Sequence, residues 1–231
     1  MLTFLGYTLV FLALLVSLYL VIRPEASSRS FLRTAAMGTQ SSPFLLLSLS
    51  FIFEATSLDL VSSYVGEGLP LFYRISAVWG SRSGPLLMWA SMMSVIAWLM
   101  SRDRKTDAET IRVMHFWTLL LLLISAGLRP FSPAIPGSAG EISPLLQTDL
   151  MVIHPPVVFV YYSLCLATAS IAVSGLIRSR PSNETHASMI PWARYSFLAG
   201  TIGIGLGGLW AYTVLDWGGY WAWDPVETGS L

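Results

Sequence analysis

The stretch LTFLGYTLVFLALLVSLYLVI, residues 2–22, contains no charged side chain. A helix needs about 20 mostly apolar residues to cross the hydrocarbon core of a bilayer, and this run provides them. It is longer than the apolar core of a signal peptide, and no basic residue precedes it. It therefore predicts a retained transmembrane helix and decides the class of the fold.

The rest of the chain has the same character. Hydrophobic residues make up 54% of the 231 residues and charged residues only 11%, unlike an ordinary soluble domain. We predict an all-α integral membrane protein with about six transmembrane helices. The predicted spans are residues 3–22, 43–61, 84–100, 111–128, 151–177 and 193–214.

The basic residues orient these spans, because cytoplasmic loops collect Lys and Arg. Ten of the 13 basic residues follow the first, third and fifth spans. The opposite side holds only Arg74, Arg82 and Arg129. Both termini are therefore predicted to lie outside the cytoplasm, in a cell (plasma) membrane or a mitochondrial inner membrane.

Charge and cysteine content exclude several classes of function. The net charge is zero and the basic residues are scattered, so no basic stripe could follow the phosphates of a nucleic acid. Cys165 is the only cysteine, which excludes an internal disulfide and a Cys-x-x-Cys site. The composition predicts that membrane lipid surrounds the protein. Nucleic acid is not expected as a partner.

The last residues, WGGYWAWDPVETGSL (217–231), gather aromatic rings around two glycines on the predicted outer side. Such rings occur in interfacial belts, but their flat faces and the close backbone approach at glycine also suit a planar apolar ligand. Asp224 and Glu227 read as a helix N-cap and a capping-box acid. We divide the chain into a six-span domain, 1–214, and a tryptophan-rich segment, 215–231, which we expect to be incomplete.

Three stretches carry a resemblance to a known family. WGGYWAWDPVE resembles the tryptophan-rich WWD signature of the CcmF/CcsA haem-handling family of cytochrome c maturation. SPLLQTDLMVIHPP (143–156) and YRISAVWGSRSGPLLMW (73–89) are similar to segments in the N-terminal half of CcmF, although Arg82-Ser83 stands where that family has His-Glu. The residues at the shared positions of the signature are Trp217, Gly218, Trp221, Trp223, Asp224 and Glu227.

The resemblance implies haem as the cofactor, with His154 as an axial ligand of its iron on the outer face. It implies a component of a cytochrome c haem lyase (holocytochrome c synthase) complex, in which haem is attached to apocytochrome c. The expected partners are a haem chaperone, thiol-handling proteins, and a companion polypeptide with the missing C-terminal half and the second axial histidine. The tryptophan-rich segment would pack against the ring, and Arg74, Arg82 and Arg129 could pair with its propionates.

Two other classes of function stay open at this stage. Glu54 falls inside the second predicted span, and an acid within the membrane suits a proton-coupled transporter. A scaffold that recruits partners without a cofactor is the third reading. His115 and His186, which match no ligand position of the family, are expected to be structural or solvated.

Overall fold

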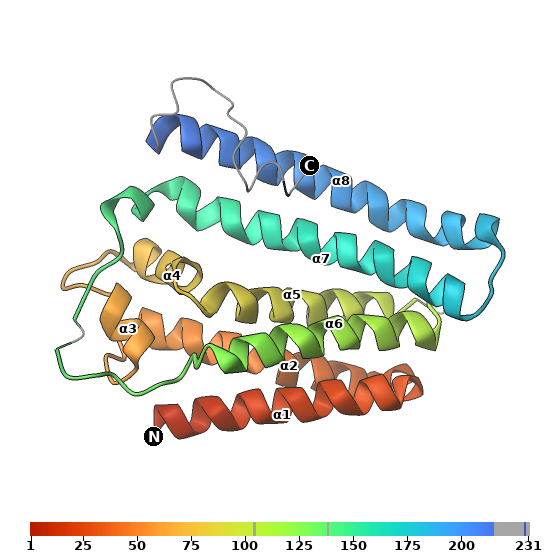
Figure 1. Cartoon of the computed structure of the whole chain (residues 1–231), viewed down its shortest axis with the longest axis horizontal. Helices are drawn as coiled ribbons and strands as arrows, with labels where there is room; N and C mark the ends of the chain where they lie inside the picture. The colour runs from red at the N-terminus through yellow and green to blue at the C-terminus, as the bar shows by residue number, and fades with distance from the viewer. Residues whose placement is uncertain (104, 138, 215–228, 230–231) are drawn as a thin grey trace.

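The computed structural model describes residues 1–103, 105–137, 139–214 and 229 (Figure 1). Within these ranges every regular element is helical, and an isolated bridge joins Leu58 to Pro133. The all-α prediction is confirmed. The elements are α1 (Leu2–Ile22), η1 (Pro24–Ser28), α2 (Ser30–Ile52), α3 (Asp59–Tyr64), α4 (Leu71–Gly80), α5 (Gly84–Met100), α6 (Ala108–Gly127), η2 (Pro144–Leu146), α7 (Asp149–Ile177) and α8 (Ser182–Val214).

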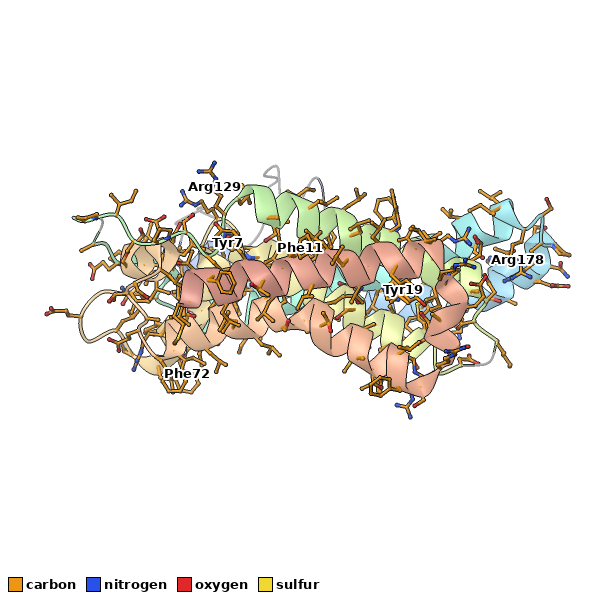
Figure 2. The ribbon with its side chains drawn as sticks, turned by 90° about the horizontal axis from the view of Figure 1, so that it is seen from below. Tyr7, Phe11, Tyr19, Phe72, Arg129 and Arg178 are labelled. Carbon is orange, nitrogen blue, oxygen red and sulfur yellow. The ribbon has the colours of Figure 1, made fainter. Side chains whose placement is uncertain are left out.

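The long helices run roughly antiparallel and form one elongated bundle (Figure 1). α1, α2, α5 and α6 pack around a common core, α7 packs on α5 and α6, and α8 packs on α7. One end, the loop end, carries α3, α4, η2 and the segments 128–137 and 139–148. The other, the basic end, carries η1, the segments 101–103 and 105–107, and the turn 178–181. Figure 2 shows Arg129 and Arg178 at these opposite ends.

Several helices are suited to cross a membrane. α1, α6, α7 and α8 have the length and apolar composition of spans, and α4 with α5, bent by 90° between them, adds a fifth candidate. The chain is therefore a multi-pass membrane protein. α2 has the length of a span but a less apolar composition, so the count of six stays a prediction.

The second predicted span, 43–61, is wrong, because α2 begins at Ser30 and ends at Ile52. Residues 39–42 look like a loop in sequence, yet Gln40 and Ser41 are buried inside the bundle. Gln40 donates to the Ser17 hydroxyl of α1 at 2.8 Å, and Ser41 contacts the Ser94 hydroxyl of α5 at 2.9 Å. Partners on neighbouring helices let polar side chains lie within a membrane bundle.

The placement of Glu54 within that span is also wrong. Glu54 follows the end of α2, has a positive φ of 52°, and lies exposed beside Arg74, whose guanidinium is 2.5 Å from its carboxylate. Asp59 begins the separate helix α3. The acid that suggested a proton-coupled transporter is therefore a surface residue at the loop end.

The last predicted span began too late. α8 extends back to Ser182, so residues 182–192, with His186 among them, lie in the helix and not in a loop. Its first turn is polar and includes Glu184, whose charge suits the N-terminus of a helix. Hydropathy marks only the apolar part of a helix, whereas backbone hydrogen bonding continues beyond it.

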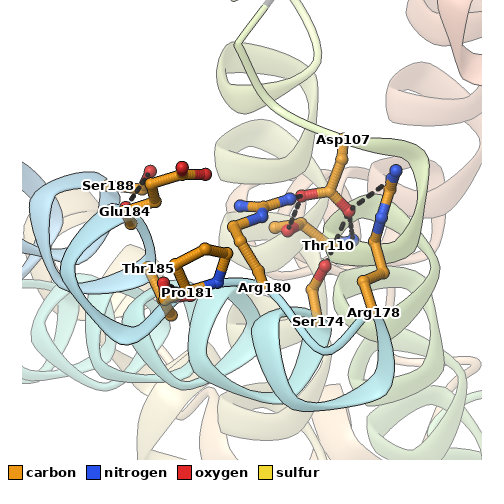
Figure 3. Close-up of polar contacts among 9 residues, drawn as sticks. All are labelled: Asp107, Thr110, Ser174, Arg178, Arg180, Pro181, Glu184, Thr185 and Ser188. Atoms are coloured by element: carbon orange, nitrogen blue, oxygen red, sulfur yellow. Dashed lines mark hydrogen bonds and ion pairs between the residues drawn. The ribbon is translucent and has the colours of Figure 1, made fainter.

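A partly buried carboxylate, Asp107, joins two helices at the basic end (Figure 3). Asp107 caps α6 by accepting from the Thr110 backbone N–H at 2.9 Å, and it accepts from Ser174 of α7 and from Arg180, both at 2.6 Å. Burial alone would raise the pKa of Asp107, but the hydrogen bonds from Ser174, Thr110 and Arg180 outweigh it, and the pKa falls well below its usual range. This cluster ties α6 to the end of α7.

Candidate functional site

The first turns of α7 hold His154 at the loop end of the bundle. Pro155 and Pro156 follow it inside the helix and have no N–H group, so the carbonyl oxygens four residues earlier lose their helical donors. The indole Nε1–H of Trp79, in α4, donates to the first of these, the Met151 carbonyl, at 2.7 Å. The proline pair therefore creates the acceptor by which α4 anchors the backbone beside His154.

The imidazole of His154 is held in one orientation. Its Nδ1 lies 2.9 Å from the carbonyl oxygen of Gly203 in α8, and the ring is partly buried. A carbonyl can only accept, so Nδ1 carries the hydrogen and Nε2 keeps its lone pair. Metal-binding histidines are commonly fixed in this way by a second partner on the other nitrogen.

Glycines of α8 make room for this contact. A Cβ atom at Gly207 would lie 2.7 Å from Cε1 of His154, and one at Gly200 would lie 2.9 Å from the ring of Tyr161. Small residues at this spacing let membrane helices approach closely. The imidazole therefore reaches the α8 backbone only because position 207 has no side chain.

An indole borders the same imidazole. The rings of Trp210 and His154 have centroids 6.2 Å apart and an interplanar angle of 31°. The Nε1–H of Trp210 is buried and has no hydrogen-bond partner among the described residues. The site thus combines an oriented imidazole with an unused donor.

The three predicted arginines all lie at the loop end, in different states. Arg74 pairs with Glu54 and donates to the Ile52 carbonyl at 3.0 Å. Arg82 pairs with Asp59 at 2.8 Å. Arg129 projects into solvent from the turn after α6 (Figure 2), and its side chain has no ion pair within the described part of the chain.

The remaining predicted site residues lie outside the described part of the chain; they are Trp217, Gly218, Trp221, Trp223, Asp224 and Glu227. The other two histidines agree with their expected roles. His115 is buried, with Nδ1 3.1 Å from the side-chain nitrogen of Gln40, and His186 is exposed near the start of α8.

Sequence reasoning missed Trp79, Gly203, Gly207 and Trp210 as neighbours of His154. The glycines at 200, 203 and 207 do share one helix face, and that spacing is a signal of close helix packing. Nothing in the sequence says which helix packs there or that the Gly203 carbonyl faces a histidine.

Comparison with known families identifies the chain. A family model described as cytochrome C assembly protein matches residues 79–231, more than half of the sequence. The chain belongs to the cytochrome c assembly family. The resemblance to CcmF that the three sequence stretches indicated is thereby confirmed.

Individual members of the cytochrome c assembly family agree. The chain is 32% identical to the cytochrome c-type biogenesis protein CcmF of Escherichia coli over 220 residues, which cover 90% of this chain and 34% of that protein. It is 32% identical to the cytochrome c-type biogenesis protein NrfE of Haemophilus influenzae over 197 residues, 80% of this chain and 31% of that protein. The chain spans about a third of the length of these relatives.

A solved structure shares the fold. The structure titled cytochrome c heme lyase CcmF superposes with a TM-score of 0.81 and 22% sequence identity, covering 100% of this chain and 39% of that one. The helix arrangement of Figure 1 is therefore a CcmF-like membrane fold.

Proposed function

We propose that this cytochrome c assembly protein holds haem on the outer face of the membrane for attachment to apocytochrome c, with His154 as an axial ligand. The observation that carries the proposal is the 2.9 Å contact between His154 Nδ1 and the Gly203 carbonyl, which leaves Nε2 available to a metal. Imidazole is a usual axial ligand of haem iron.

The described residues suit a metal that arrives with most of its own ligands. No group of three or more His, Cys, Asp or Glu side chains within them is placed to hold a bare metal ion. A porphyrin supplies four nitrogen ligands itself, so one oriented imidazole is enough to fill the axial position of the iron on one side of the ring. The second axial histidine is assigned to a companion polypeptide.

The loop end is the part of the bundle assigned to the outer face. Arg129 is the arginine best placed to meet a propionate, because Arg74 and Arg82 already pair with carboxylates of this chain. The tryptophan-rich segment 215–231 is assigned to the face of the ring. A haem chaperone and thiol-handling proteins are the further partners proposed.

When bound, haem supplies the vinyl groups that join cytochrome thiols, so the work of this chain is positioning. The backbone of α8 orients the imidazole of His154, and Trp79 fixes the turn of α7 that carries this histidine. The membrane would be a cell (plasma) membrane or a mitochondrial inner membrane.

The deciding experiment is the absorption spectrum of the chain purified from haem-replete cells, alone and co-expressed with the polypeptide carrying the remaining family sequence. We expect a Soret band that His154→Ala removes and that added imidazole restores. His186→Ala, at an exposed histidine of the opposite end, is the matched control and should keep the band. A cofactor-free scaffold would show no band in either preparation, and that result would overturn the proposal.

A further inference from the structure

A cavity of about 350 Å³ opens at the basic end, far from His154. It is enclosed by η1, the start of α2, residues 101–103 and 106, and the start of α6. Its volume falls within the range of small-ligand sites, about 300–1,000 Å³. α1 ends at Ile22, two residues before the cavity wall begins at Pro24, so the cavity lies where a spanning helix leaves the hydrocarbon core.

Two buried donors in the cavity wall have nothing to bond. Ser27 is 4% exposed, and its hydroxyl is buried without a partner within the described residues. The Nε–H of Arg33 is likewise buried and unpartnered, although Nη1 of the same side chain donates to the Ser101 carbonyl at 2.8 Å. Buried donors without partners are costly, and because both residues line the cavity, a change of side-chain rotamer would turn either donor to an oxyanion bound there.

The charges around the cavity are balanced but separated. Arg33 and Arg102 line it together with the carboxylates Glu25 and Asp103. None of the four takes part in an ion pair in the described ranges of the chain. Arg102 lies over the Trp98 ring at 4.7 Å, and Asp103 accepts from the Lys105 backbone N–H. Two carboxylates would repel a simple anion, whereas a ligand with both charges can meet both pairs.

We propose that this cavity binds the headgroup of an ethanolamine phospholipid, with its phosphate at Ser27 and the arginines and its ammonium at Glu25 and Asp103. A primary ammonium can donate to carboxylates, whereas a trimethylammonium cannot. Choline groups are typically held by aromatic cages, and the described residues lining the cavity include no aromatic side chain. The lipid is a better source than a free phosphoethanolamine because the cavity lies at headgroup depth.

The test is native mass spectrometry of the delipidated chain, titrated separately with phosphatidylethanolamine, phosphatidylglycerol and phosphatidylcholine. Phosphatidylethanolamine should bind at least about fivefold more tightly than the other two. Ser27→Ala should weaken it by about tenfold, the loss expected for a hydrogen bond to a charged group. Arg29→Gln, at the same end but outside the cavity wall, is the matched control and should change nothing.

A second variant should change the affinities for two lipids in opposite directions, which loss of the fold cannot do. Glu25→Gln, at an exposed site, should weaken phosphatidylethanolamine and strengthen phosphatidylglycerol, because it removes a negative charge from the wall. Equal binding of all three lipids, or indifference to both Ser27→Ala and Glu25→Gln, would overturn the proposal. Competition by soluble phosphoethanolamine at the concentration effective for the lipid would overturn the lipid as the source.

Discussion

Two helix seams of this protein each contain a histidine, and they use it in opposite ways. In the core seam, between α1, α2 and α6, His115 is 5% exposed and meets Gln40, which also donates to Ser17. In the glycine seam, between α7 and α8, His154 is partly buried and meets a backbone carbonyl. One histidine faces a donor and the other an acceptor.

The partner decides what each ring can do. The Ser17 hydroxyl donates to the Ala13 carbonyl at 2.8 Å, so it accepts from Gln40, and the amide nitrogen therefore faces both Ser17 and His115. Nδ1 of His115 must then accept, and its Nε2 carries the hydrogen. His154 is the reverse, with the lone pair on Nε2. Of the two seams, the glycine seam therefore leaves the Nε2 lone pair that the proposed haem ligand needs.

The largest effect is expected where the glycine seam is closest. Gly207→Leu would place a side chain where the His154 ring lies, so the ring must leave the Gly203 carbonyl. If His154 is the ligand proposed above, the haem absorption should fall at least about tenfold, because the nitrogen proposed as ligand is no longer oriented. Gly205→Leu is the control, since a Cβ there meets nothing within 4 Å. Equal absorption in both variants would contradict this account of the seam.

The next largest effect is expected from the contacts of Asp107 with Ser174 and Arg180 at the basic end. It should appear in the stability of the protein and not in haem binding. Asp107→Asn leaves Arg180 without its carboxylate, and because this pair is only partly buried we expect a loss of about 1–2 kcal/mol, below the cost of breaking a fully buried pair. The low pKa of Asp107 means that its contribution is present at neutral pH and fades as the pH falls below about 4. Thermal midpoints in detergent should therefore differ between wild type and variant at pH 7 and converge at low pH.

Glu109→Gln is the matched control for the Asp107 prediction. Glu109 pairs with the partly exposed Arg112 one turn away on the same helix, and such pairs contribute little. A loss of stability as large as that of Asp107→Asn would show that the general charge at this end, and not the contacts of Asp107 with Ser174 and Arg180, is responsible.

The core seam provides a smaller and purely structural effect. Gln40→Leu removes the two donated bonds, and hydrogen bonds between membrane helices contribute about 0.6 kcal/mol each, so we expect a loss of about 1 kcal/mol. The haem band should not change. If it fell as far as in Gly207→Leu, the distinction between the two histidines would be lost.

The smallest effect is expected at the anchor of α7. Trp79→Phe removes the donor to the Met151 carbonyl, at a cost of about 0.6 kcal/mol. Hydrogen–deuterium exchange of residues 149–154 should rise. Trp98→Phe, which removes the indole bonded to Thr34 at the basic end, should leave that exchange unchanged. Faster exchange in both variants would mean that the hydrogen bond from Trp79 to the Met151 carbonyl does not specifically stabilise the start of α7.

The sequence located most helices well and failed where polarity and burial conflict. The span 84–100 coincides with α5, and 3–22 differs from α1 by one residue. The second span was displaced because residues 30–42 include many polar side chains, among them Gln40, which is 1% exposed in the bundle. Hydropathy counts each residue alone, whereas the environment of Gln40 is created by Ser17 and His115 on other helices.

The sequence by itself determined the membrane class, the family and the candidacy of His154, because apolar run length and motif spacing are local properties of the chain. The tertiary structure decided the rest of the site. The Gly203 carbonyl, the space at Gly207 and the Trp79 anchor reach His154 from α8 and α4. The hydrogen on Nδ1, and with it the free lone pair on Nε2, depends on an acceptor 49 residues away in the chain, which only packing could bring there.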